Sequence, residues 1–242
     1  MIQLNESILS RAYHAIPRIW VNTMELSYKA LKARHRLERA GYPTNLSLRV
    51  HRALSWLNRA EQMKRDQDGR FIFLWIAFNA AYANEIVSYE RYSEQRIFGQ
   101  FFQRICEMDT ERKLYEMLWD EFAGSIRVLL DNRYVFQPFW DFCNGKLTSD
   151  QWRQRFRRAN SAAQKALASQ KTPVVLSIVF SRLYTLRNQI IHGGATWDGQ
   201  VNRDQIRDGV HILDALVPNI IETMMNHPDE VWGDPIYPVI EE

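Results

Sequence analysis

The residues with the clearest chemical potential stand at the end of an apolar stretch, in the sequence RNQIIHGG that runs from Arg187 to Gly194. Arg187 carries a fixed positive charge, and His192 carries an imidazole, the side chain most often used for proton transfer in catalysis. Gly193 and Gly194 remove side-chain bulk beside the imidazole and end a helix, which predicts that His192 lies at an exposed rim. We therefore take Arg187 and His192 as the candidate catalytic pair.

Helical spacing decides which side chains of this segment lie close together. At about 100° per residue, Arg187 and His192 point about 140° apart, so only the length of the arginine brings its guanidinium to the same pocket. Asn188 lies four residues before His192 and shares its face. It is predicted to orient the imidazole or to donate a hydrogen bond to a phosphate oxygen.

Several familiar chemistries are absent from the sequence. It has no glycine-rich phosphate loop, no HExxH or CxxC and no GxSxG, and its six histidines form no pair at the spacing of metal ligands. We therefore predict no metal and no cofactor. Among the other histidines, His14, His35 and His51 stand between charged residues and are predicted to be solvated.

Composition points to a globular protein in a reducing, cytoplasmic location. The 242 residues are 46% apolar and 24% charged, and only two are cysteines. No secretory signal is visible. The longest apolar run, 71–83, is too short for a membrane span and contains Asn79, so it predicts a buried helix and no membrane contact.

The balance of basic residues leaves two interpretations open. The net charge is only +3, but 24 of the 31 basic residues are arginines. Arginine suits phosphate and stacks on bases, which favours a nucleic-acid partner. A GC-rich genome would raise the arginine content in the same way.

The hydrophobic period is helical almost everywhere, which predicts an all-α protein without significant β-sheet. Asn45 or Ser47 is predicted to be the N-cap of a helix that ends at about 63. Thr148 and Gln151 have the spacing of a capping box at the start of the helix 149–169. The predicted helical segments are 4–39, 45–63, 70–90, 94–133 (two or three helices), 149–169, 173–192 and 203–226; 134–147 is predicted to be an irregular connection and 195–202 a loop capped at Asn202.

The motif and one apolar helix together resemble the HEPN superfamily of all-α domains. RNQIIH matches the R-x4–6-H motif of that family, in which the first x is often Asn, and FLWIAFNAAYANE resembles the apolar partner helix of several HEPN families. The resemblance covers about 70–90 and 173–215. It implies a single domain, 1–242, with an HEPN-like core at about 1–91 and 173–226, a helical insertion at 92–172 and a docked C-terminal tail at 227–242.

The resemblance implies that the protein is a metal-independent endoribonuclease that acts as a toxin or antiphage effector. His192 serves as base or acid, Arg187 clamps the phosphate, and the 2′-hydroxyl of RNA is the nucleophile. A homodimer supplies the second histidine, and an antitoxin or another defence-system protein is the expected partner. Gly194 stands where related toxins carry a Tyr for adenylylation, so that form of control is not expected here.

The supporting residues each have a structural and a functional interpretation. Asn79 either buttresses the His192 loop or is a buried amide satisfied locally, and Arg203 and Arg207 either bind RNA or are solvated first-turn residues. The arginines of 152–158 either form an RNA-approach patch or a solvated helix face, and Trp197 either stacks on a base or anchors its loop. Two alternative functions remain open: a catalytically inactive HEPN-like binding module, and an unrelated all-α protein.

Overall fold

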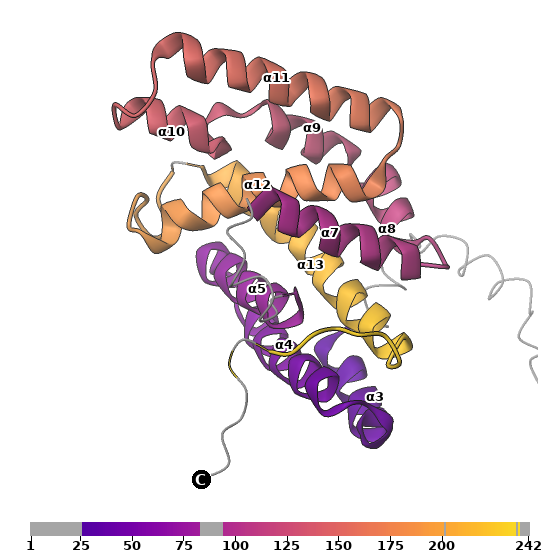
Figure 1. The fold of residues 1–242 in the computed structure, drawn as a ribbon. Helices are drawn as coiled ribbons and strands as arrows, with labels where there is room; N and C mark the ends of the chain where they lie inside the picture. The colour runs from indigo at the N-terminus through magenta and orange to yellow at the C-terminus, as the bar shows by residue number, and fades with distance from the viewer. Residues whose placement is uncertain (1–25, 83–93, 201, 236, 238–242) are drawn as a thin grey trace, which may run out of the picture.

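All the regular elements that the structure describes are helices, which confirms the predicted all-α class (Figure 1). The computed structural model describes residues 26–82, 94–200, 202–235 and 237. The α-helices are α3 (Tyr28–Glu38), α4 (Thr44–Gln62), α5 (Gln67–Tyr82), α7 (Glu94–Met108), α8 (Lys113–Glu116), α9 (Ala123–Asp131), α10 (Gln137–Cys143), α11 (Ser149–Ala168), α12 (Thr172–Ile191) and α13 (Arg203–Asn226). A π-helical turn follows α8 at Met117–Glu121, and 3-10 turns lie at Arg39–Gly41 and Arg133–Val135.

The helices form three groups in space, as Figure 1 shows. α3, α4 and α5 lie together at one side, and α13 crosses against α5. α7 runs along α12 in the middle, although the sequence of α7 falls in the expected insertion 92–172. α9, α10 and α11 cover the other side of α12.

An aromatic cluster holds α5, α7 and α12 together. The ring of Phe180 on α12 lies 4.4 Å from Phe78 of α5 and 4.7 Å from Phe102 of α7, between centroids. All three side chains have no exposed surface. The buried, tilted packing of these rings explains why the predicted central helix is apolar on most sides.

Helix ends agree with the sequence where local chemistry sets them. Thr148 and Gln151 form both hydrogen bonds of the predicted capping box at α11. The predicted cap of α4 is wrong, because the helix begins at Thr44 after Pro43, which precedes both Asn45 and Ser47.

The connection 134–147 is more regular than predicted. It contains α10, with Pro138 in its first turn, where a missing N–H does no harm. Gly145 follows α10 in a left-handed conformation (φ +73°), and Trp140 and Phe139 pack edge to face. A helix of seven residues is too short for its periodicity to be read, so the prediction of an irregular segment was wrong.

The end of the described chain lies on the helical body. Trp232 is 6% exposed, and the buried Arg49 of α4 donates hydrogen bonds to the carbonyls of Trp232 and Gly233. Tyr237 is 78% exposed and is held by its carbonyl oxygen, which accepts from Arg52. The expected docking of the tail 227–242 is therefore made by the side chain of Trp232, and Ile236 lies outside the described residues.

His35 corrects a prediction. It was expected to be solvated, but its side chain is 1% exposed between α3 and α4. Its Nε2 lies 3.5 Å from Ser47 Oγ, and its Nδ1 has no hydrogen-bond partner. His51 is exposed as predicted, and His14 lies outside the described residues.

None of the helices in the described part of the chain combines the length and the apolar character that crossing a lipid bilayer requires.

Candidate functional site

The end of α12 has the geometry that two consecutive glycines allow. Gly193 adopts a left-handed conformation (φ +69°), and its N–H donates to Ile190 O at 3.2 Å. The N–H of Gly194 donates to Gln189 O at 2.7 Å. These two bonds form a Schellman motif that satisfies the last carbonyls of the helix and leaves His192 as its C-cap residue. His192 is exposed, as predicted.

Arg187 and His192 both contact Asn188. The Nη1 of Arg187 donates to Asn188 Oδ1 at 2.8 Å, and the backbone N–H of His192 donates to Asn188 O at 3.0 Å. The bond from His192 is an ordinary backbone bond of the helix, and no hydrogen bond within the described residues joins the imidazole to the guanidinium of Arg187. Asn188 fixes the guanidinium by its side chain and the C-cap residue by its main chain.

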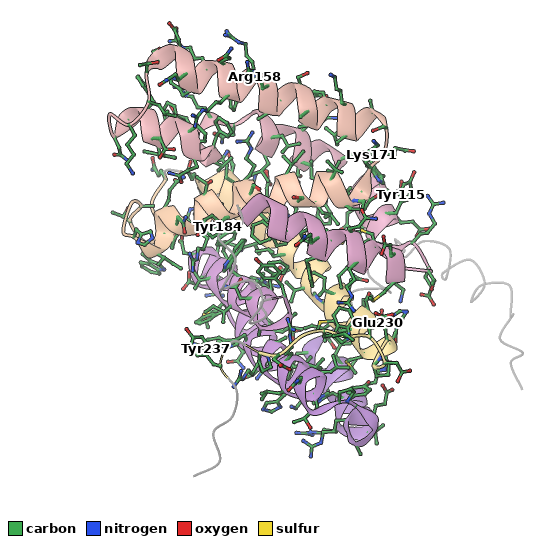
Figure 2. The ribbon with its side chains drawn as sticks, in the orientation of Figure 1. Tyr115, Arg158, Lys171, Tyr184, Glu230 and Tyr237 are labelled. Carbon is green, nitrogen blue, oxygen red and sulfur yellow. The ribbon has the colours of Figure 1, made fainter. Side chains whose placement is uncertain are left out.

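The guanidinium of Arg187 is only half-exposed. Its Cζ lies 5.6 Å from the centroid of the Tyr184 ring, one helical turn earlier, and its Nε is buried with no hydrogen-bond partner. Figure 2 labels Tyr184 on α12. The ring and Asn188 hold the guanidinium in place, so an oxyanion that binds to its exposed part costs little side-chain freedom.

Gln189 is a residue of the motif that the sequence did not single out. Its Nε2 donates to Tyr134 O at 2.6 Å, and its Oε1 accepts from Asn202 Nδ2 at 2.7 Å. Gln189 therefore ties the last turn of α12 both to the segment after α9 and to the start of α13. Its position three residues before His192 was the available signal.

A cavity of about 650 Å³ opens beside these contacts. Its lining comes from the end of α9 and the turn after it, from α11 and from the start of α13, and comprises Asp131, Asn132, Arg133, Tyr134, Trp152, Phe156, Asn202 and Gln205. Tyr134 and Asn202 are the two residues that Gln189 contacts. The cavity is lined by neither Arg187 nor His192, so it lies next to the motif and is separate from it.

The two arginines expected to bind RNA have acidic neighbours. Arg203 donates from Nη1 to Asp68 Oδ2 at 2.8 Å and from Nε to Gly199 O at 2.9 Å, so it fastens the loop before α13 to α5. Arg207 is more exposed, and its Nη2 lies 3.0 Å from Asp204 Oδ1 on the same helix. A surface pair of this kind is weak, and Arg207 is the freer of the two.

The remaining predicted residues take different places. Trp197 is 74% exposed, and its Nε1 donates to Asp66 Oδ1 at 3.3 Å, so the loop is anchored while the ring stays open. Asn202 precedes α13 in a left-handed conformation (φ 59°) but makes no capping bond, because its side chain binds Gln189. Asn79 is half-buried, and no hydrogen bond within the described residues joins it to the motif.

The arginines of α11 lie as the helical period predicts. Trp152 is buried and Phe156 is half-buried, whereas Arg153, Arg157 and Arg158 are exposed, the last of them labelled in Figure 2 on the outer helix. Arg153 lies over Trp152, with Cζ 5.9 Å from the ring centroid. The exposed basic face of α11 therefore continues to the wall of the cavity.

Comparison with known proteins finds no match to this chain among family models, curated proteins or solved structures. Within the described residues, no group of three or more His, Cys, Asp or Glu side chains is arranged to hold a metal ion.

Proposed function

We propose that the protein is a metal-independent endoribonuclease of the HEPN type, acting as a toxin or antiphage effector in the cytoplasm. The observation that supports the proposal is the end of α12, where Arg187 and the exposed His192 both contact Asn188. A guanidinium and an imidazole suit the two needs of RNA cleavage, which are charge stabilisation at phosphorus and proton transfer.

The reaction follows from the chemistry of the substrate. Neutral His192 removes the proton of the 2′-hydroxyl, whose oxygen attacks phosphorus. The bond from phosphorus to the 5′-oxygen breaks, and a protonated His192 supplies the proton for the leaving oxygen. Arg187 stabilises the negative charge that builds on the phosphoryl oxygens. The products are a 2′,3′-cyclic phosphate and a 5′-hydroxyl.

Two proton transfers call for two imidazoles, and we propose that a second copy of the chain supplies the other. Ile191 is 49% exposed and Trp197 is 74% exposed, on either side of His192 in the sequence. Exposed apolar side chains of this size suit a contact between protomers. The homodimer then places two motifs at one cleft, and Ile191→Glu is expected to yield monomers that do not cleave RNA.

The decisive experiment is cleavage of labelled RNA by the purified chain in EDTA. His192→Ala and Arg187→Ala are each expected to slow cleavage at least about a hundredfold, because each removes a group that acts in the transition state. The matched controls are His211→Ala, at an exposed histidine of α13, and Arg59→Ala, at an exposed arginine of α4. Cleavage that needs a divalent metal, or that survives in His192→Ala, contradicts the proposal.

A second candidate is an HEPN-like module that binds RNA or a partner protein without cleaving RNA. The observation that favours it is the cavity beside the motif, which neither Arg187 nor His192 lines. Binding of RNA by the wild-type chain with no cleavage under any ionic condition selects this candidate.

A further inference from the structure

The cavity beside the motif has the lining of a site for a flat, polar ring. Tyr134, Trp152 and Phe156 supply aromatic surface, and Asn132, Asn202 and Gln205 supply side-chain amides. An amide offers both a donor and an acceptor, which is what the edge of a nucleobase requires, while aromatic rings stack on its faces. At about 650 Å³ the cavity is in the range of small-molecule sites and is large enough for one nucleotide.

The polar group that the cavity leaves available is the amide of Gln205. Gln205 lies at the start of α13 and is half-buried, and its side chain forms no hydrogen bond within the described residues. Trp152, which is 8% exposed, contributes aromatic surface only, because its indole Nε1 is buried and out of reach of a ligand in the cavity.

The electrostatic setting favours an anionic ligand. Arg182 of α12 is 3% exposed, and its Cζ lies 5.8 Å from the centroid of Phe156, the ring that lines the cavity. Its Nη2 donates to a carbonyl, Leu130 O at 3.4 Å, and no carboxylate among the described residues pairs with it, so its charge is not neutralised locally. Arg133 at the rim and the exposed Arg153 of α11 add two further cations, against the single carboxylate of Asp131.

Gln189 connects this cavity to the motif. It contacts two lining residues, Tyr134 and Asn202, and it lies between Arg187 and His192 in the sequence of α12. Because Gln189 precedes His192 by three residues, the cavity adjoins the turn of α12 that ends at the imidazole.

We infer that the cavity of Tyr134, Trp152, Phe156 and Gln205 is a nucleobase subsite, which takes an unpaired base of single-stranded RNA next to the phosphate held at the motif. The inference rests on the proposed function, because it takes RNA as the ligand. It assigns base selection to Gln205 and stacking to Tyr134, with Gln189 as a positioning residue.

The test uses the full chain and fluorescein-labelled RNAs of about ten nucleotides that differ in base composition. All riboses are 2′-O-methylated, which blocks attack by the 2′-hydroxyl and separates binding from cleavage. Fluorescence anisotropy is expected to show a preference among the compositions. Tyr134→Ala is expected to weaken binding about five- to a hundredfold through lost stacking, and Gln205→Ala to flatten the preference.

The control is Gln154→Ala, at an exposed glutamine of α11 outside the cavity, which is expected to bind as the wild type does. Thermal unfolding of each variant verifies that it is folded, and Gln205→Glu gives a second, isosteric change at the selecting position. Equal binding by wild type, Tyr134→Ala and Gln205→Ala overturns the inference, as does the absence of binding by any of the RNAs.

Failure of the proposed function has a different signature. If the wild type and His192→Ala bind the methylated RNAs alike but the wild type leaves unmethylated RNA intact, the subsite stands and the nuclease does not. If the wild type cleaves RNA while Tyr134→Ala and Gln205→Ala keep full affinity and base preference, the nuclease stands and the subsite does not.

Discussion

Two arginines of the described chain are buried without a carboxylate partner. Arg49 is 1% exposed and Arg182 is 3% exposed, and burial lowers the pKa of each to about 10, so both stay protonated at neutral pH. The two Nη groups of Arg49 donate to carbonyls, and Arg182 lies over Phe136, with Cζ 4.3 Å from the ring centroid. Part of the arginine excess therefore serves packing, and only the exposed arginines argue for a nucleic-acid partner.

His35 predicts a loss of stability in mild acid. Burial is the main reason that its pKa is lowered from 6.5 to about 4, and the nearby charges of Lys32, His51 and Arg39 act in the same direction. The unfolded chain binds this proton at higher pH than the folded chain does. The contribution of this group to the free energy of unfolding should therefore decrease as the pH is lowered from about 6.5 to about 4, by up to about 3 kcal/mol.

Urea unfolding at a series of pH values measures this effect. His35→Phe keeps a ring in the site but cannot bind a proton, so its stability should depend less on pH in the same window. The pKa of His51 is also lowered by burial, which leaves some slope in the variant. His192→Ala is the control at an exposed histidine and should keep the wild-type slope. Identical slopes for wild type and His35→Phe contradict the assignment.

At the scale of the helices, Gly209 sets how closely α13 approaches its neighbours. A Cβ at this position would lie 2.9 Å from Phe71 Cε2 of α5 and 3.0 Å from Leu183 Cδ2 of α12. The contact with Phe71 is closer than carbon atoms tolerate, the contact with Leu183 requires that side chain to shift by a few tenths of an ångström, and both partners are fully buried. The glycine thus allows three helices to meet at one point.

Gly209→Ala is expected to lower the free energy of unfolding by about 1–3 kcal/mol, because the added methyl forces the crossing apart. Gly124→Ala on α9 is the matched control, since nothing lies within 4 Å of its Cβ, and it should be neutral or slightly stabilising. Chemical denaturation of the three proteins measures the difference. A Gly209→Ala protein as stable as the control variant is incompatible with this packing.

At the scale of the whole molecule, one buried side chain fastens the end of the chain to the body. Arg49 donates to Ala81 O at the end of α5 and to the carbonyls of Trp232 and Gly233. The indole of Trp232 lies under Arg104 of α7, with Cζ 5.3 Å from the ring centroid, and Arg104 also pairs with Glu230 at 2.9 Å. The segment after α13 therefore joins α4, α5 and α7.

Arg49→Met is expected to destabilise the fold by about 2–4 kcal/mol, because two buried carbonyls and one partly buried carbonyl lose a charged donor. In Arg49→Met, the backbone amides of residues 230–235 should exchange hydrogen faster than in the wild type, and by a larger factor than amides in the body of the protein. Arg52→Ala removes only the bond to Tyr237 O and should change stability by less than about 0.5 kcal/mol. Unchanged exchange at 230–235 in Arg49→Met excludes this role.

Much of the helical framework was predictable because local interactions set it. The spans of α11, α12 and α13 were predicted to within a residue or two, since an apolar period, a capping box and a pair of glycines all act within one or two turns. The short α10 and the buried His35 were missed, because a seven-residue helix has too little period and His35 is covered by residues of α4.

The candidate site also has features that the sequence predicts and features that only helix packing determines. That Arg187, Asn188 and His192 lie within the last turn and a half of α12, with His192 at an exposed end, follows from spacing and glycine chemistry alone. The pairing of Arg203 with Asp68 and the cavity joined to Gln189 depend on residues that are 135 and 55 positions apart in the chain. Contacts over such separations arise from helix packing, which no local pattern records, so only the tertiary structure decided them.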